Sequence, residues 1–436
     1  MREWRRSSLR QILGAPVSGK RPAGGVNTET DGIPSLGGEN IRANGGMAYD
    51  TINRIPASFF RLMPKGRLQS GDVLINKDGA QTGKVGIYDG RFSDAAVNEH
   101  VFILRSSNGS IDQRLLYYYL LLPETQSSIA KRITGSAQPG LNSQFVDAVH
   151  LTIPTDRDEQ QRIAEVLAII DEALEQTEAL IAKTQQIKAG LMHDLFTRGV
   201  TQDGQLRPPG HAATTQFGVL PHGWIAGSLL DVADSYRQPI LTGPFGADLG
   251  NDDFVPEGVP VLRIGNVQSG YLDLQDLLFV TPRKARELSR YAIRPGDLLF
   301  ARQGATTGRN ALATDLVDGC LINYHIIRVA LDYDKCAPLF IEAAFNGEMV
   351  KRQVERDKGR GTREGINTAQ LKALKVPLAP LAEQRAIAEL LGAQSAEVSS
   401  LQDQRAELRH LKAGLMHDLL TGRVRVPAAE LKEVAI

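Results

Sequence analysis

The chain has 436 residues, 42% of them hydrophobic and 23% charged, which is ordinary for a globular protein of two to three domains. Its 50 basic and 50 acidic residues give a net charge of zero, which argues against a uniformly basic nucleic-acid binder but leaves room for local basic patches. A run of about 18 apolar residues would predict a membrane span, and an apolar stretch after the first charges would predict a secretory signal. The sequence has neither, so we expect a cytoplasmic protein without a membrane partner.

Residues 1–155 are rich in glycine and contain short runs of β-type residues, such as Val73-Leu-Ile75 and Val101-Phe-Ile-Leu104. This texture predicts a compact mixed α/β domain built on a twisted sheet. Gly79 and Gly83 bracket a segment that superficially suggests a phosphate loop, but their spacing is too short and Val85 stands where such a loop needs Ser or Thr. We therefore interpret it as a turn between strands, with glycines supplying positive φ.

The turn, and a second segment of the same domain, carry side chains of the types that contact phosphates and base edges of DNA. In the turn these residues are Lys77, Gln81, Thr82 and Lys84. In the second segment they are Lys131, Arg132 and Gln138. A surface turn and a solvated loop are the simpler interpretations of each segment taken alone. His100, two residues after an asparagine, is expected to be a buried structural residue at a strand.

Residues 156–198 are predicted to form a long helix that starts just after a proline and stops at Gly199. Its apolar residues recur at alternating spacings of three and four, the pattern of a coiled-coil seam. The seam consists of Ile163, Leu167, Ile170, Leu174, Thr177, Ile181, Thr184, Leu191 and Leu195. The two threonines would weaken an apolar coil; they either fix its register or mark where helices of another protein insert.

A linker over 199–219 leads to a second domain, 220–380, that matches the first at an offset near 225 residues. In this domain the counterpart of the polar turn contains Arg302, Gln303, Thr306, Thr307 and Arg309. A later segment, more basic than its counterpart in the first domain, contains Lys358, Arg360 and Arg363. The recurrence of polar, basic loops at the same place favours binding over plain surface, and His325 repeats the position of His100. Cys320 and Cys336 have no counterparts in the first half and are expected to be free buried thiols.

Residues 381–422 repeat the long helix at an offset of 224 residues, before a tail over 423–436. The eight residues Lys188–Leu195 recur letter for letter as Lys412–Leu419. Because both helices carry one seam in one frame, we expect them to pack antiparallel in a pseudo-twofold molecule. In the second helix the apolar seam positions are Ile387, Leu391, Val398, Leu401, Leu408, Leu415 and Leu419.

The sequence contains none of the motifs HExxH, CxxC or Gly-x-Ser-x-Gly, so we assign no catalytic or metal-binding residue. The dipeptides His193-Asp194 and His417-Asp418 invite a catalytic interpretation, but adjacent helix residues point in different directions and do not form one site. Structure or contact with a partner is the better interpretation of both.

The chain resembles the specificity subunit of type I DNA restriction-modification systems. The resemblance rests on the order, twice, of several short motifs: the run Gly32-Ile-Pro-Ser-Leu-Gly-Gly-Glu-Asn-Ile41, the opening Leu220-Pro-His-Gly-Trp224, the Gly-Asp-x-Leu strands at 71–74 and 296–299, and the Glu-Gln-x-x-Ile-Ala-Glu helix starts at 159 and 383. It spans essentially the whole chain.

This resemblance implies two target-recognition domains separated by two antiparallel helices that set their spacing. Each domain would recognise half of an interrupted site in double-stranded DNA. Two methyltransferase subunits, which bind S-adenosylmethionine, would dock on the helical region, and two restriction-translocase subunits can join them. The resemblance further implies a subunit with no catalytic residue and no cofactor of its own.

Two alternatives from other classes remain at this point. An internally duplicated DNA-processing nuclease would need clustered carboxylates for a metal ion; Asp72 and Lys77 faintly echo such a motif, although Asn76 stands where a second acid is needed. A scaffold with two binding domains that do not bind DNA is the other alternative.

Overall fold

The computed structural model describes residues 4–23, 25, 31–135, 139–210, 212–246, 248–359 and 364–426. It divides into two compact units. Unit 1 comprises Met1–Glu178 and Asp403–Ile436, and unit 2 comprises Ala179–Gln402. Each of the two long helices therefore contributes one part to each unit, whereas the predicted domains follow chain order. Within the described residues, none of the helices combines the length and the apolar character that crossing a membrane requires.

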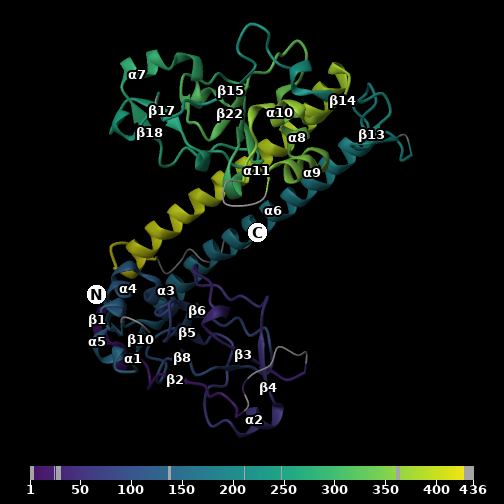
Figure 1. The fold of residues 1–436 in the computed structure, drawn as a ribbon. Helices are drawn as coiled ribbons and strands as arrows, with labels where there is room; N and C mark the ends of the chain where they lie inside the picture. The colour runs from purple at the N-terminus through teal and green to yellow at the C-terminus, as the bar shows by residue number, and fades with distance from the viewer. Residues whose placement is uncertain are drawn as a thin grey trace. The chain divides into compact units, whose positions relative to one another are not determined.

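Unit 1 contains short strands in two main sheets, and its helices lie beside them (Figure 1). The four-stranded sheet has the order β2 (Val17–Ser18), β8 (Val101–Leu104), β5 (Val73–Asn76), β6 (Val85–Ile87). The three-stranded sheet has the order β4 (Asn53–Ile55), β3 (Ile33–Leu36), β7 (Ala96–Val97). Two further pairs join β1 (Trp4–Ser8) to β11 (His150–Pro154) and β9 (Ile133–Thr134) to β10 (Gly140–Leu141). The helices are α1 (Leu9–Ile12), η1 (Gly38–Asn40), α2 (Ala57–Leu62), α3 (Gln113–Leu121), α4 (Pro123–Ala130), α5 (Phe145–Ala148) and α6 (Arg157–Arg198).

The core of unit 1 joins both ends of the chain. Helix α3 is capped by Asp112, whose carboxylate accepts a hydrogen bond from the backbone N–H of Leu115 at 2.9 Å. Its buried face, Leu115–Leu120, packs in one cluster with α1, β5 and the start of α6. Met416, Leu419 and Leu420 from the far end of α11 (Leu381–Leu420) lie in the same cluster. The last turn of the last helix is thus part of the first domain's core.

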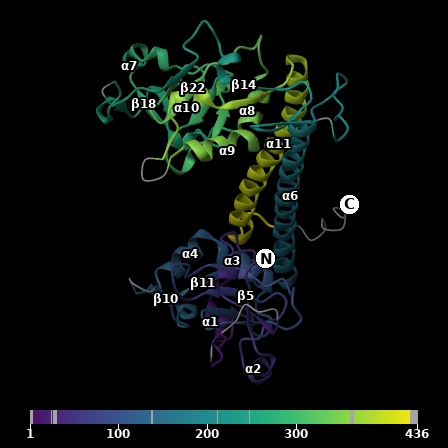
Figure 2. The same ribbon diagram turned by 45° about the vertical axis from the view of Figure 1, so that its right-hand side comes forward.

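Unit 2 repeats this plan, but its second sheet has one additional edge strand. One four-stranded sheet is β15 (Ile240–Thr242), β22 (Ile326–Val329), β19 (Leu298–Ala301), β20 (Asn310–Leu312), and the other is β16 (Phe254–Val255), β18 (Leu278–Val280), β17 (Val259–Leu262), β21 (Leu321–Ile322). The pairs are β12 (Ala212–Thr215) with β13 (Gly218–Pro221) and β14 (Ile225–Ser228) with β23 (Lys375–Leu378). Short helices are η2 (Leu229–Asp231), η3 (Asn251–Asp253), η4 (Ile264–Asn266), α7 (Pro282–Glu287), η5 (Ser289–Tyr291), η6 (Gly304–Thr306) and η7 (Asp315–Val317). Beside β14 and the first part of α11 lie α8 (Pro338–Phe345), α9 (Glu348–Asp357) and α10 (Thr368–Ala373) (Figure 2).

The duplication extends to the pairing of strands. In unit 1, β3 runs parallel to β7, and in unit 2 the equivalent β17 runs parallel to β21; the main sheets are otherwise antiparallel. The predicted class, two similar mixed α/β domains with two long antiparallel helices, is confirmed. The expectation of one twisted sheet in each domain is wrong, because strands of two to four residues end at turns and build two small main sheets instead.

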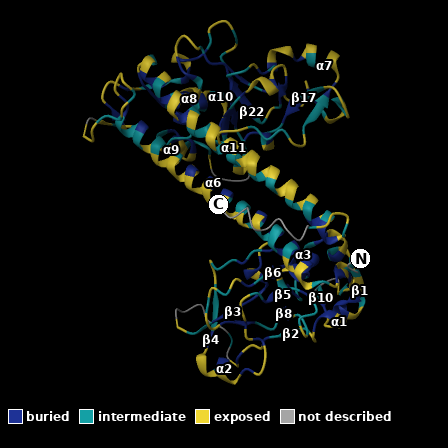
Figure 3. Ribbon diagram, turned by 180° about the vertical axis from the view of Figure 1, so that it is seen from behind, coloured by how far each residue is buried: buried dark blue, intermediate teal, exposed yellow. Residues whose placement is uncertain are grey.

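Helices α6 and α11 are antiparallel in both units. In unit 1, Lys412 forms an ion pair with Asp171 at 2.5 Å. In unit 2, Lys188, which is the repeat equivalent of Lys412, donates a hydrogen bond to Ser395 at 2.8 Å. Exposed residues run along both helices (Figure 3). The predicted seam positions are all buried or half-buried. The buried seam residues are Ile163, Leu167, Ile170, Thr177, Ile181, Thr184, Leu195, Ile387, Leu391 and Leu419, while Leu174, Leu191, Val398 and Leu415 are half-buried.

The start of each long helix is tied to the segment that follows the other one. Glu159 lies at the start of α6 and accepts a hydrogen bond from Arg425 at 2.7 Å. Glu383 lies at the start of α11 and accepts one from Arg207, also at 2.7 Å. Each helix stops at a glycine of positive φ, as predicted, and the aromatic ring of Trp4 covers Gly422. The first described strand and the segment after the last helix therefore meet within unit 1.

Both cysteines are free and buried, as the sequence predicts. Burial raises the pKa of the Cys336 thiol to about 12, so this sulfur stays protonated and unreactive at neutral pH.

Candidate nucleic-acid interface

The polar loop of unit 1 connects β5 to β6 and is a turn, as predicted. Gly79 and Gly83 have φ of +84° and +94°, values that a side chain would strain. The hydroxyl of Thr82 donates a hydrogen bond to the carbonyl of Gly79 at 2.6 Å. Gln81 is exposed at the tip, where its side-chain oxygen accepts a hydrogen bond from the Lys84 ammonium at 2.8 Å. The turn thus presents a cation and an amide together.

The second predicted segment lies against this loop. The backbone N–H of Gly79 donates to the carbonyl of Pro139 at 2.9 Å, and that of Leu141 donates to the carbonyl of Lys77 at 2.7 Å. Lys131 and Arg132 are exposed just after α4, at the start of the β9–β10 hairpin. Gln138 lies outside the described residues. Two segments some 60 residues apart in sequence therefore form one surface.

Unit 2 builds the same arrangement around the loop between β19 and β20. The N–H of Gly304 donates to the carbonyl of Glu364 at 2.9 Å, and that of Ile366 donates to the carbonyl of Arg302 at 2.8 Å. Lys358 precedes this contact and pairs with Glu355 at 2.7 Å. Arg360 and Arg363 are outside the part of the chain that the structure describes.

The side chains of the second loop differ in how they are held. The guanidinium of Arg302 donates to the carbonyls of Ile366 and Tyr324, each at 3.2 Å, and burial lowers its pKa. It therefore fastens the loop to its neighbours. Arg309 is half-buried and donates a hydrogen bond to the side-chain oxygen of Gln268 at 2.7 Å. The hydroxyls of Thr306 and Thr307 donate to backbone carbonyls, which leaves their oxygens able to accept.

The expectation that His100 and His325 are buried is wrong. The side chain of His100 is 50% exposed, and its Nδ1 lies 3.1 Å from a carboxylate oxygen of Asp78. His325 is half-buried, with Nδ1 2.9 Å from the side-chain oxygen of Gln303. Each lies two residues after an asparagine whose side-chain oxygen accepts a hydrogen bond from the backbone N–H of the histidine. Both histidines therefore lie in a turn that precedes a strand, and not in the strand itself. Both belong to the polar surface, and the repeat of Asn-x-His beside the repeat of the loops was the signal for this.

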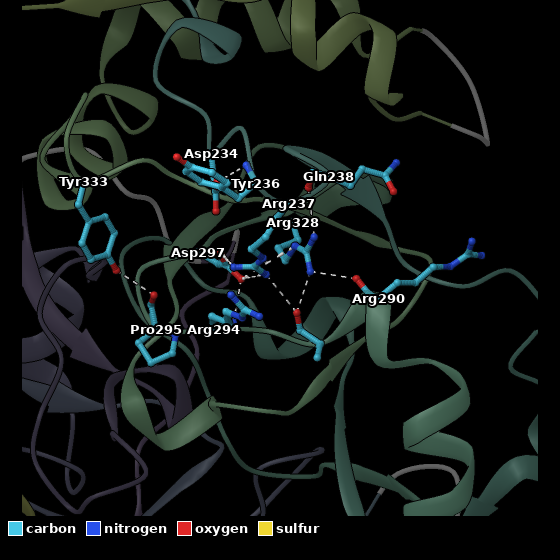
Figure 4. A network of polar contacts seen from close by, with 11 residues as sticks. Asp234, Tyr236, Arg237, Gln238, Arg290, Arg294, Pro295, Asp297, Arg328 and Tyr333 are labelled. Carbon is cyan, nitrogen blue, oxygen red and sulfur yellow. Dashed lines mark hydrogen bonds and ion pairs between the residues drawn. The ribbon is translucent and has the colours of Figure 1, made fainter.

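Asp72, on which the nuclease interpretation rests, is a structural residue. Its carboxylate accepts hydrogen bonds from Arg105 at 2.5 and 2.6 Å. The equivalent Asp297 accepts two from Arg237, both at 3.0 Å, and the buried Arg328 lies beside this pair (Figure 4). Both carboxylates precede the strand that leads to the polar loop and so lie at its opposite end. Among the described residues, no group of three or more His, Cys, Asp and Glu side chains could hold a metal ion.

The identical octets of α6 and α11 have both buried and exposed residues. Leu195 and Leu419 are buried in the cores of unit 2 and unit 1. Ala189, Gly190 and His193 are exposed, as are Ala413, Gly414 and His417. Packing accounts for the identity of the buried positions but not for that of the exposed ones.

Comparison with protein families matches residues 1–186 and 246–410 to the type I restriction modification DNA specificity domain. The type I restriction enzyme MjaVIII specificity subunit of Methanocaldococcus jannaschii is 23% identical over 416 residues, which cover 94% of this chain and 90% of that protein. The type I restriction enzyme EcoBI specificity subunit of Escherichia coli is 20% identical over 408 residues, or 92% of this chain and 81% of that protein.

Solved structures share the fold. The S subunit of a type I restriction-modification system from M. genitalium superposes with a TM-score of 0.62 at 13% identity, over 96% of each chain. A chain from a structure of a type I R-M system superposes with a TM-score of 0.52 at 17% identity, over 97% of this chain and 98% of that one.

Proposed function

Since the chain belongs to the family of type I restriction modification DNA specificity domains, we propose that it is a sequence-recognition subunit that binds an interrupted site in double-stranded DNA. In this proposal residues 1–155 and 220–380 are its two target-recognition domains, and each contacts one half of the site. The chemistry of methyl transfer and cleavage then belongs to partner subunits, and this chain contributes no catalytic residue.

One observation carries the proposal: the same composite surface is built twice. In each unit a polar, basic turn, a histidine and a second Gly-rich segment meet at one end of a β-hairpin. Cations that contact phosphates position a protein on DNA, and amides and hydroxyls recognise base edges. The loops differ in their side chains, Gln81 and Thr82 against Thr306 and Thr307, so the two half-sites should differ in sequence.

The exposed identical residues of the octets support two equivalent contacts with one kind of partner. His193 and His417 each stand on a helix beside an exposed Ala-Gly pair, which leaves the backbone open to close approach. We assign these patches to two copies of a methyltransferase subunit, which would carry S-adenosylmethionine. Two restriction-translocase subunits complete the proposed complex.

Sequencing of methylated bases in a host with and without this gene tests the proposal. We expect one interrupted motif to lose its methylation when the gene is removed and to regain it on complementation. The purified chain should not methylate DNA without the methyltransferase subunit. Methyl transfer by the chain alone would contradict the assignment. A chain that binds protein but no DNA would also contradict it and would favour the scaffold alternative.

Replacement of Lys84 or Arg309 with Ala is expected to weaken DNA binding by the assembled complex at every sequence. If each cation neutralises one phosphate, the slope of log K against log salt should become shallower by about 0.9. Lys183→Ala, at an exposed position of α6, is the control and should leave the slope unchanged. Equal slopes for all variants would move the phosphate contacts elsewhere.

Replacement of Gln81, Thr82, Gln303 or Thr306 with Ala is expected instead to change sequence preference while the salt slope is kept. The first two changes should alter one half of the recognised motif, and the last two the other half. Selection from a randomised DNA pool measures this directly.

Insertion of one heptad after Leu174 and another after Val398 is expected to lengthen the spacer of the recognised site. Seven residues keep the seam in phase and add about 10 Å of helix. A pair of five-residue insertions at the same places is the control, because five residues rotate the seam by about 140° away from its partner helix and should abolish binding. Retained binding with an unchanged spacer would show that the helices do not set the spacing.

A further inference from the structure

The second domain has an exposed aromatic group beside its polar loop. Phe245 is 59% exposed and Tyr324 is 39% exposed. Their ring centroids lie 6.3 Å apart, and the Tyr324 ring lies 3.7 Å from that of His325. Large apolar surfaces in water are unfavourable, and these rings contribute to none of the buried clusters of unit 2.

This aromatic group is continuous with the surface proposed to bind DNA. The carbonyl of Tyr324 accepts a hydrogen bond from Arg302 at 3.2 Å, and His325 contacts Gln303 at 2.9 Å. Tyr324 and His325 also line a depression of about 600 Å³ together with Phe254 and Arg263. A base edge that reaches Gln303 would therefore lie next to an aromatic wall.

The equivalent place in unit 1 is charged. Strand pairing makes Gly19 the counterpart of Gly243. A Cβ on Gly19 would collide with the carbonyl of Val97, just before the Asn-x-His turn, and one on Gly243 with the carbonyl of Asn323, within it. The next two residues are Lys20 and Arg21 in unit 1 but Pro244 and Phe245 in unit 2. The middle residue of the turn is Glu99 in unit 1 and Tyr324 in unit 2. The scaffold has therefore been given an apolar wall in only one of its two copies.

We propose that Phe245 and Tyr324 form a thymine-recognising wall in the second domain, which contacts the 5-methyl group of one thymine in its half-site. The methyl group of thymine is the apolar feature that a base pair presents in the major groove, and in a duplex the base faces are covered by stacking. The charged counterpart in unit 1 has no such preference, so the effect is confined to one half-site. This inference rests on the proposed function.

The test uses the full chain assembled with its methyltransferase subunit and its mapped DNA site, with each thymine in turn replaced by uracil. For the wild type, uracil at one position of the second half-site should weaken binding about fourfold, the ratio that corresponds to the ~0.8 kcal/mol of one buried methyl group. In Tyr324→Ala and Phe245→Ala the same replacement should have no effect. Tyr324→Phe keeps the ring and should behave as the wild type.

Tyr236→Ala is the matched control, because Tyr236 is 98% exposed in the same unit but lies near Asp234 and Arg237, towards the opposite end of β19 (Figure 4). It should keep the sensitivity to uracil. Circular dichroism of all variants checks that they fold. A Tyr324→Ala complex that still distinguishes thymine from uracil overturns the inference. The inference is also overturned if replacement of thymine by uracil weakens binding only in the first half-site. Wild-type complex that binds no specific DNA would instead overturn the proposed function.

Discussion

A fragment covering residues 1–205 is expected to pair with a second copy of itself and, with the methyltransferase subunit, to modify a symmetric site. The recognised DNA site would be the first half-site followed by its inverted copy, a motif that the full chain does not recognise. A twofold dimer is the expected form, because each copy offers the same helix to the other.

The structure gives this pairing a specific basis. Lys412 lies beside Asp171 in unit 1, and Lys188 lies beside Ser395, which occupies the place of Asp171 in unit 2. In the dimer, Lys188 of each copy would meet Asp171 of the other, so the ion pair is restored twice. Met192, Leu195 and Phe196 would replace Met416, Leu419 and Leu420 in the core of unit 1.

Thr177, one of the two seam threonines, is a smaller obstacle than its polarity suggests. In the dimer, Thr177 would face α6 of the other copy, which contains the same threonines, instead of α11. Its hydroxyl, however, already donates a hydrogen bond to the carbonyl of Ala173 at 2.7 Å within its own helix. A buried hydroxyl that is satisfied in this way adds little penalty when its neighbour changes.

A longer fragment, 1–210, provides the comparison. It adds Arg207, which in the full chain contacts Glu383 at 2.7 Å and in the dimer would contact Glu159, the role that Arg425 has in unit 1. We expect 1–210 to dimerise more tightly than 1–205. Analytical ultracentrifugation followed by mapping of methylated bases measures both steps. Strictly monomeric fragments that restore no symmetric methylation would show that the two halves are complementary rather than equivalent.

Asp297→Ala is expected to destabilise unit 2 by about 3–5 kcal/mol, because it leaves buried charge without its counterion. The carboxylate is 3% exposed, and Arg328, at 3%, lies beside it with Arg237. Burial already lowers the pKa of Arg328 to about 10, which indicates that its charge is poorly solvated even with Asp297 present. Hydrogen exchange of the β19 and β22 amides reports this loss within unit 2.

The equivalent change in unit 1, Asp72→Ala, should have a smaller effect of about 1–3 kcal/mol. Its partner Arg105 is 42% exposed and can turn to water. Asp332→Ala, which breaks an ion pair with the 43% exposed Lys335, is the control and should have the smallest effect of the three. Equal effects of Asp72→Ala and Asp297→Ala would show that burial of the partner arginine does not decide the outcome.

Periodicity and repetition predicted the parts of this fold that depend on local pattern. The long helices, their seam, their stops at Gly199 and Gly422 and the polar turns all follow from spacing and from glycine at positive φ. The predicted antiparallel packing of the two repeated helices also explains why the end of the last helix lies in the core of unit 1.

Contacts that depend on tertiary structure were not predictable in the same way. Arg302 looks like a free cation in the sequence, but its guanidinium is used by two backbone carbonyls. His100 and His325 were placed in strands because the turn that holds them is short. The division into small sheets depends on pairings such as β3 with β7, which lie about 60 residues apart.

The discontinuity of unit 1 sets the order in which the protein can fold during synthesis. Residues 179–402 form unit 2 as one uninterrupted stretch, so that unit can close as soon as the ribosome has released it. Unit 1 must wait, since Met416, Leu419 and Leu420 of its core are made after the whole of unit 2. The domain translated first is therefore completed after the second one, and a stop codon between residues 402 and 416 would damage unit 1 while sparing unit 2.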